Sequence, residues 1–105
     1  MTPAGADPHG DPGEDPLSCA LQAVGQRWAL LIVRALLESP KRYGDLQREL
    51  GVPTNILATR LKGLQESGVV YRVPMAHNVL AYDLTERGRA LRPVIDALED
   101  WGGSD

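Results

Sequence analysis

Polar side chains that can hydrogen-bond to DNA recur at intervals of three or four residues between Thr54 and Glu66. An Asn can pair with adenine, a Thr can offer its hydroxyl or methyl group, and a Lys can reach guanine or a phosphate. Projected onto a helix, these polar residues lie opposite a stripe of leucines. The polar side holds Asn55, Thr59, Lys62 and Glu66, with Ala58 on its shoulder, and the stripe holds Leu57, Leu61 and Leu64.

Taken alone, this polar face is open to two interpretations. An ordinary solvated helix shows the same pattern, with Lys62 and Glu66 as an ion pair four residues apart. A DNA-reading helix uses the same residues for base and phosphate contacts. Arg60 projects nearer the leucine stripe, where it either reaches a flanking phosphate or pairs with an acid inside the protein. The residues of this helix that we predict to contact DNA are Thr54, Asn55, Ala58, Thr59, Arg60 and Lys62.

The second group that could do chemistry is the thiol of Cys19, the only cysteine in the chain. A thiol at a helix N-terminus can favour the reactive thiolate form, although no basic residue lies near Cys19 in sequence to strengthen this effect. The alternative role is that of a small buried apolar side chain. A lone cysteine also suits a reducing compartment.

The sequence lacks the residue groupings that catalytic and metal sites need. Its two histidines, His9 and His77, lie far apart, and no Gly-rich phosphate loop follows a predicted strand. Cys19 and these histidines do not form a ligand cluster with a recognised spacing. We therefore expect no enzymatic activity, no cofactor and no metal.

Charge and composition divide the 105 residues into three parts. The net charge of −3 argues at first against nucleic acid, but residues 27–92 alone carry +5, between two end segments that each carry −4. Residues 1–16 hold four of the eight prolines and no Leu, Ile, Val or aromatic residue, so we predict a disordered tail there. Residues 17–105 are then left for one domain.

The N-terminus and the apolar segments give no sign of export or membrane insertion. The first residues have no basic stretch followed by an apolar one, and the chain has no apolar run of about 18 residues. We therefore expect a cytoplasmic protein without a membrane partner.

Hydrophobic periodicity predicts three consecutive helices in the first two thirds of the chain. The segment Gln26–Glu38 is apolar at nearly every position, so other helices or a second subunit must cover it on more than one side. The sequence Ser39-Pro40 ends it. Two shorter helices, Tyr43–Leu50 and Thr54–Glu66, are joined by a tight turn that contains Gly51, which is typical of a helix-turn-helix.

A β-hairpin and a last helix are predicted to follow. The segments VVYRVP and VLAYDLT are rich in β-branched and aromatic residues and flank four turn residues. Thr85 caps a final helix through Asp100, in which Pro93 predicts a kink or a late start near Arg92. This order of elements is that of a winged helix-turn-helix, a mainly α fold with a small β-hairpin wing, and it favours the DNA-reading interpretation.

Polar residues outside the recognition helix are further candidates for contacts with DNA. Arg72, His77 and Asn78 belong to the predicted wing, although a His at a hairpin tip is more often simply solvated. Lys41 and Arg42 precede the first helix of the pair, where they would bind phosphate or serve solubility.

The chain resembles the HxlR-type winged-helix regulators, which are small dimeric bacterial transcription factors related to the MarR group. The resemblance covers about residues 19–102 and rests on the order and spacing of several short motifs. These are Gly25-Gln26-Arg27-Trp28 with Leu30-Leu31-Ile32, Pro40-Lys41-Arg42-Tyr43 with Leu46, Leu57 to Leu61 and Leu64 with Gly68-Val69-Val70, Tyr82-Asp83-Leu84-Thr85-Glu86 with Gly88, and Leu98 to Trp101-Gly102.

This resemblance implies a cytoplasmic homodimer held together by its first and last helices. Each protomer would place one recognition helix in the major groove of a pseudo-palindromic operator, with half-sites about 10 bp or a multiple of 10 bp apart, and repression is the expected effect. The dimer interface is expected to include Leu21, Trp28, Leu31, Leu91, Ile95, Leu98 and Trp101.

The resemblance also bears on the wing and on the chemical signal to which such a regulator responds. Family wings usually carry an Arg before the Tyr-x-Leu-Thr motif, and this chain has none there, which weakens the expected role of the wing. Some members sense oxidants, quinones or aldehydes through a Cys just before the first helix, a position that Cys19 matches. A protein-interaction adaptor, or a regulator that responds to a small ligand without thiol chemistry, is the alternative function.

Overall fold

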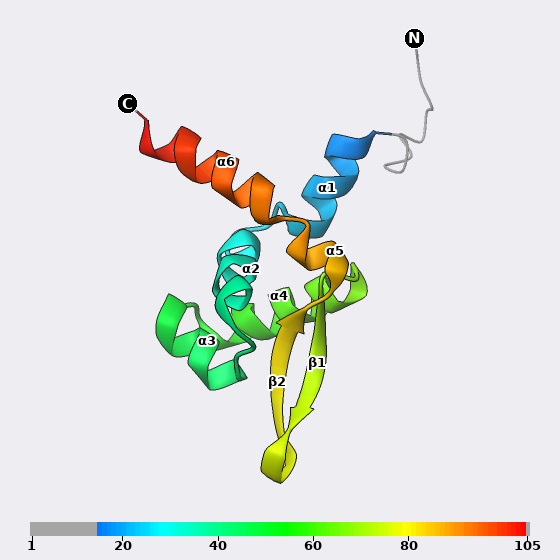
Figure 1. Cartoon of the computed structure of the whole chain (residues 1–105), viewed down its shortest axis with the longest axis vertical. Helices are drawn as coiled ribbons and strands as arrows, with labels where there is room; N and C mark the ends of the chain where they lie inside the picture. The colour runs from blue at the N-terminus through cyan, green and yellow to red at the C-terminus, as the bar shows by residue number, and fades with distance from the viewer. Residues whose placement is uncertain (1–14, 105) are drawn as a thin grey trace.

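The computed structural model describes residues 15–104, and these form a small helical body with a projecting β-hairpin (Figure 1). The predicted winged helix-turn-helix is confirmed. The elements in chain order are α1 (Pro16–Val24), α2 (Ala29–Glu38), α3 (Tyr43–Leu50), α4 (Thr54–Glu66), β1 (Val70–Met75), the 3-10 turn η2 (Ala76–Asn78), β2 (Val79–Leu84), α5 (Glu86–Arg89) and α6 (Arg92–Gly103).

The first helix starts inside the segment that was predicted to be a disordered tail. Pro16 is its first residue, and the Asp15 carboxylate accepts hydrogen bonds from the backbone N–H and the hydroxyl of Ser18. The hydroxyl bond lowers the pKa of Asp15 below its ordinary value of 3.8. An Asp N-cap followed by Pro is a strong helix start, and the composition of the segment obscured it. The rest of the predicted tail lies outside the described residues.

A sharp turn separates α1 from α2, and the prediction of a helix from Gln26 was therefore wrong by three residues. The Gly25 N–H donates to the Leu21 carbonyl and ends α1, and Trp28 adopts a left-handed φ of 80° just before α2 begins. The guanidinium of Arg27 lies 5.4 Å from the centre of the Trp28 ring, a cation–π distance. The axes of α1 and α2 are bent by 76° as a result.

Helix α2 forms the centre of the core, as its apolar sequence predicts. Its Ile32, Val33 and Leu36 are fully buried, and α2 packs against α3, α4, α6 and strand β2. The core also contains Leu46 from α3 and the three leucines of α4, Leu57, Leu61 and Leu64.

The antiparallel hairpin of β1 and β2 is joined by a tight turn at residues 76–79. Val70 pairs with Leu84 at the base of the hairpin, and Met75 pairs with Val79 at its tip. His77 and Asn78 have φ values of 63° and 62°, and the Val79 N–H donates to the Ala76 carbonyl. Positive φ at both central residues is the pattern of a type I′ turn, which matches the twist of a hairpin.

The predicted last helix is divided into α5 and α6. Thr85 caps α5 as expected, because its hydroxyl oxygen accepts from the Gly88 N–H at 3.0 Å. Pro93 lies in the first turn of α6, so the predicted late start near Arg92 is confirmed. The outer half of α6 extends away from the body, on the side opposite the hairpin (Figure 1).

No single helix within residues 15–104 is long and apolar enough to cross a membrane. The pair α1 and α2 reaches such a length and composition only when the two are counted together, and α2 is the buried centre of the core.

Candidate nucleic-acid interface

Helix α4 is held in a helix-turn-helix by its leucines and by the turn before it. Gly51 ends α3 with a left-handed φ of 69°, a conformation that costs glycine little. The Gly51 N–H donates to the Gln47 carbonyl. The Tyr43 hydroxyl of α3 donates a hydrogen bond to the Thr54 carbonyl at the start of α4. These contacts fix the direction in which α4 leaves the turn.

The burial of the α4 leucines turns the opposite side of the helix to solvent. Leu57 is completely buried, and Leu61 and Leu64 are nearly so. The exposed residues of α4 include five predicted to contact DNA, namely Thr54, Asn55, Ala58, Thr59 and Lys62. The structure therefore brings these five residues together on one accessible face.

The exposed face of α4 retains hydrogen-bonding capacity. The Thr59 hydroxyl donates to the Asn55 carbonyl at 3.0 Å, which leaves its oxygen free to accept and its methyl group free for contact. Among residues 15–104, no carboxylate lies within ion-pair distance of Lys62, so the alternative pairing with Glu66 does not form there. A charged ammonium is thus available to an external anion.

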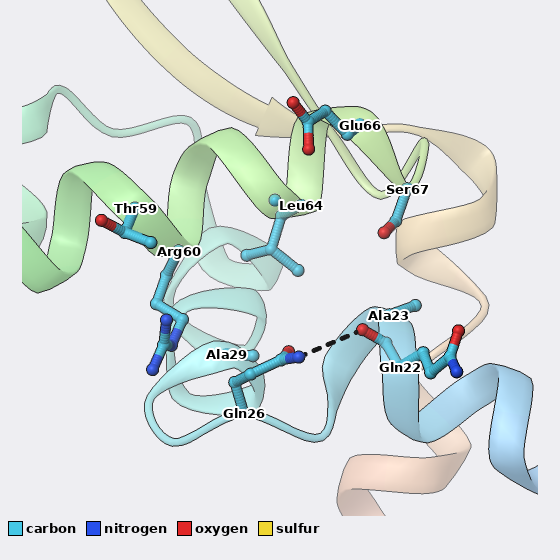
Figure 2. Close-up of a pocket in the computed structure, with 10 residues that line it drawn as sticks. Gln22, Ala23, Gln26, Ala29, Thr59, Arg60, Leu64, Glu66 and Ser67 are labelled. Carbon is cyan, nitrogen blue, oxygen red and sulfur yellow. Dashed lines mark hydrogen bonds between the residues drawn. The ribbon is translucent and has the colours of Figure 1, made fainter.

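Arg60 lies on a different side of α4 from this face. Its Nε donates to the Arg27 carbonyl at 2.8 Å, in the turn between α1 and α2. The predicted pairing with an internal acid does not occur within the described residues, and the side chain points toward the turn between α1 and α2 rather than along the exposed face (Figure 2). A helical projection cannot reveal this partner, because it is a backbone carbonyl 33 residues away in sequence.

Lys41 and Arg42 are both engaged inside the chain. The Lys41 ammonium lies 3.3 Å from Glu49 and 3.6 Å from Glu38, and its side chain is only 11% exposed. The backbone of Lys41 also pairs with Tyr82 of β2. Lys41 therefore ties α2, α3 and the hairpin together, and two carboxylates lie within ion-pair distance of its ammonium. Its phosphate contact stays a prediction.

Arg42 caps α3 together with Asp45 but remains accessible. Its Nε lies 3.2 Å from the Asp45 carboxylate, which also accepts the Arg42 backbone N–H at 3.1 Å. The hydrogen bond from the Arg42 side chain holds the pKa of Asp45 below 3.8. Because the Arg42 side chain is 57% exposed, its other N–H groups can still reach a phosphate.

The wing carries its predicted polar residues on the surface, together with apolar ones. Arg72, His77 and Asn78 are all exposed. Three large apolar side chains of the hairpin, Tyr71, Met75 and Leu80, are exposed as well.

A second exposed surface comprises apolar side chains of α1, α2 and α6, next to an ion pair between Arg34 and Glu99. Of the predicted interface residues, Leu21, Leu31, Leu98 and Trp101 are exposed, with Trp101 79% accessible. Trp28 and Leu91 are half-buried against the core, and Ile95 is buried within the protomer, so Ile95 serves the core of the single chain. Leu17 and Val94 are exposed beside this set and were missed. Leu17 lies four residues before Leu21, a spacing that would have indicated a helix face.

Cys19 lies inside α1 rather than before the first helix. It is the fourth helical residue, and its N–H donates to the Asp15 carbonyl at 2.9 Å. Its side chain is partly exposed. Within residues 15–104, no group of three or more His, Cys, Asp or Glu side chains is placed to hold a metal ion.

Comparisons with known proteins agree with this fold. Residues 23–105 match the profile of the HxlR-like helix-turn-helix family. The HTH-type transcriptional regulator Rv3095 of Mycobacterium tuberculosis is 44% identical over 85 residues, which cover 79% of this chain and 54% of the relative. The chain thus spans about half the length of that relative.

Solved structures show the same arrangement. The structure of PA1607 superposes with a TM-score of 0.82 at 39% identity and covers 91% of this chain and 68% of that one. Quinone-bound YodB from Bacillus subtilis superposes with a TM-score of 0.72 at 32% identity. The match covers 83% of this chain and 94% of YodB. From the profile match and these likenesses together, the chain belongs to the HxlR-like helix-turn-helix family.

Proposed function

We propose that this chain regulates transcription by binding double-stranded DNA as a homodimer. The observation that carries the proposal is the exposed polar face of α4, held outward by three buried leucines within a helix-turn-helix. A helix in this position fits the major groove, where Asn55 can pair with adenine and Lys62 can reach guanine or a phosphate.

The proposed contact set is narrower than the set predicted from sequence. It keeps the five exposed residues of α4, Arg42 before α3, and Arg72, His77 and Asn78 of the wing, which all have accessible side chains. Arg60 and Lys41 are left out, because Arg60 is hydrogen-bonded to the turn between α1 and α2 and Lys41 is paired with two glutamates.

The apolar surface of α1, α2 and α6 supports the homodimer. Large apolar side chains that protrude from two diverging helices favour burial against a second copy. A two-fold dimer would present two α4 helices to a pseudo-palindromic operator, with half-sites about 10 bp or a multiple apart. Repression follows where such an operator overlaps a promoter.

The test is the salt dependence of binding to fragments recovered from a genomic pull-down. Each phosphate that the protein neutralises contributes about −0.9 to the slope of log affinity against log salt. Lys62→Ala should reduce that slope by about one unit, whereas Glu86→Gln, on the exposed surface of α5, should leave it unchanged. A flat salt dependence of the wild-type protein would instead support a protein-interaction adaptor.

We also propose Cys19 as a point of regulation by oxidants or electrophiles. Its partly exposed position on α1, beside the apolar surface that we assign to the dimer, would let a modification there disturb the dimer. YodB, a relative of the same fold, has been solved with quinone bound. Diamide or a quinone should weaken operator binding of the wild type and not of Cys19→Ser. An identical response of both proteins would remove Cys19 from the mechanism.

A further inference from the structure

Thr59 lies at the centre of the exposed face of α4. At about 100° per residue, its side chain projects within about 15° of the direction opposite the three buried leucines of the helix. Thr59 is the sixth residue of α4, and the N-terminal residues of a recognition helix are those that contact base edges. When α4 enters a major groove, the Thr59 side chain therefore faces the bases.

The proton of the Thr59 hydroxyl is already used inside the helix. Its Oγ1 donates to the Asn55 carbonyl at 3.0 Å, one turn earlier. A threonine hydroxyl has one proton and two lone pairs, so the oxygen keeps its capacity to accept. Among residues 15–104, no group donates to this oxygen. The Thr59 hydroxyl thus meets an external group as an acceptor and not as a donor.

The residues beside Thr59 allow this short side chain to come close to a base edge. Ala58 precedes it, and Gly63 lies one turn later on the same helix. A Cβ atom at Gly63 would meet nothing within 4 Å, so packing among residues 15–104 does not require glycine there. Because glycine inside a helix is destabilising relative to alanine, its presence at this position favours a close approach by a group from outside the protein.

The four bases differ in what they offer such an acceptor in the major groove. Adenine presents its N6 amino group and cytosine its N4 amino group, whereas guanine O6 and thymine O4 are themselves acceptors. Two acceptors that face each other without a proton lose the hydrogen bonds that each made to water, which is unfavourable. The Thr59 oxygen therefore distinguishes a base with an amino group from a base with a keto group.

We propose that Thr59 makes the protein select adenine or cytosine, through the exocyclic amino group, at one position of each operator half-site. This inference rests on the proposed function. Asn55, which is proposed to pair with adenine, lies four residues earlier, about 6 Å along the helix. Since base pairs stack about 3.4 Å apart, the position that Thr59 reads lies one or two base pairs from that adenine.

The first measurement is a binding series on an operator fragment from the genomic pull-down, with each base pair replaced by the other three in both half-sites at once. We expect one position at which the wild type binds adenine or cytosine at least about fivefold more tightly than guanine or thymine, the effect of one hydrogen bond in each half-site. Thr59→Val has nearly the same shape but no hydroxyl and should reduce this preference below about twofold. Thr59→Ser keeps the hydroxyl and should retain it.

Modified bases test the amino group itself at the same position. Purine in place of adenine, or 2-pyrimidinone in place of cytosine, removes only the exocyclic amino group. This change should weaken binding of the wild type at least about fivefold more than binding of Thr59→Val. Because both proteins bind the same duplexes, the comparison cancels the effect of the modification on the DNA. Glu86→Gln, on the exposed surface of α5, should respond as the wild type does.

Two results would overturn this role of Thr59. A preference for guanine or thymine that is lost in Thr59→Val would show that the hydroxyl donates to the base. A base preference that is the same in the wild type and in Thr59→Val at every position would show that the hydroxyl reads no base. If Thr59→Val does not fold, Thr59→Ala replaces it, with the same expected loss and the same contrary results.

The binding series also separates this inference from the proposed function. Specific, salt-dependent binding in which no position responds to the loss of the Thr59 hydroxyl would refute the role of Thr59 alone. A wild-type protein that binds no DNA fragment at low salt would refute the proposed function and the role of Thr59 together.

Discussion

At the scale of single residues, the Thr85 side chain makes hydrogen bonds to two separate segments. Its hydroxyl donates to the Gly68 carbonyl at 2.6 Å, while its oxygen accepts from the Gly88 N–H at 3.0 Å. One side chain thus caps α5 and fastens it to the turn between α4 and β1.

Replacing Thr85 should therefore destabilise the protein more than a surface substitution does. We expect Thr85→Ala to lower the free energy of unfolding by about 1–2 kcal/mol, since it removes an N-cap and leaves the carbonyl without its donor. Thr85→Ser keeps the hydroxyl, so its free energy of unfolding, measured by urea denaturation, should be close to that of the wild type. Equal destabilisation by both variants would show that the methyl group matters instead.

The Asp45 carboxylate in α3 makes the stability of the folded protein depend on pH, and the direction of this dependence can be predicted. Hydrogen bonds from Arg42 hold the pKa of Asp45 below 3.8 in the folded protein. A depressed folded-state pKa contributes stability above the unfolded pKa, and this contribution is lost as the pH falls through the folded value. The wild type should therefore have a higher free energy of unfolding than Asp45→Asn at pH 7. This difference between the two proteins should disappear below pH 3.8.

Thermal unfolding across this pH range measures the difference. Asp96→Asn, on the exposed surface of α6, is the matched control. A difference that stays constant with pH would show that the carboxylate contributes nothing through its charge.

At the scale of elements, α5 can dock only because residue 88 has no side chain. A Cβ at Gly88 would lie 2.3 Å from the Val69 carbonyl oxygen and 3.1 Å from a methyl group of Leu84. The close approach of α5 to the base of the hairpin therefore requires glycine.

Gly88→Ala should lower the free energy of unfolding by about 1–3 kcal/mol, the usual cost of overpacking. Gly102→Ala is its control, because a Cβ at Gly102 meets nothing within 4 Å and Ala favours the helix. In chemical denaturation, Gly88→Ala should have a lower free energy of unfolding than the wild type, and Gly102→Ala should have a higher one. Stability of Gly88→Ala equal to that of the wild type would mean that α5 docks less tightly than this geometry requires.

The sequence predicted those elements whose signals are local. The helix-turn-helix and the hairpin follow from periodicity and turn residues, and their bounds were close to those observed. The corner between α1 and α2 was missed, because it depends on a left-handed Trp28, which sequence patterns do not indicate. The exposed face of α4 was predicted from the helical spacing of its leucines and polar residues. The partners of Arg60 and Lys41 arise only from tertiary packing.

At the scale of the whole molecule, the proposed dimer should depend on the outer half of α6. Among the large apolar residues of positions 15–104, Trp101 is the most exposed, and Leu98 lies three residues before it on the same helix. We expect Trp101→Ser to weaken dimerisation at least tenfold, since burial of an aromatic side chain contributes more than about 1.4 kcal/mol.

Sedimentation across a range of concentrations measures this effect, and the melting temperature of a dimer should also rise with concentration. Glu86→Gln, on the exposed surface of α5, is the control. A wild-type protein that stays monomeric at high concentration would contradict the proposed dimer.

The placement of α6 opposite the hairpin gives the described part of the protein an electric dipole. Asp96 and Asp100 lie on α6, where Glu99 is paired with Arg34 at 2.9 Å, whereas Lys62 and Arg72 belong to α4 and the hairpin (Figure 1). In the field of a polyanion, such a separation of charge exerts a torque as well as a force. A protein with a net charge of −3 would then still approach DNA with α4 in front, because the acidic helix is turned away before contact.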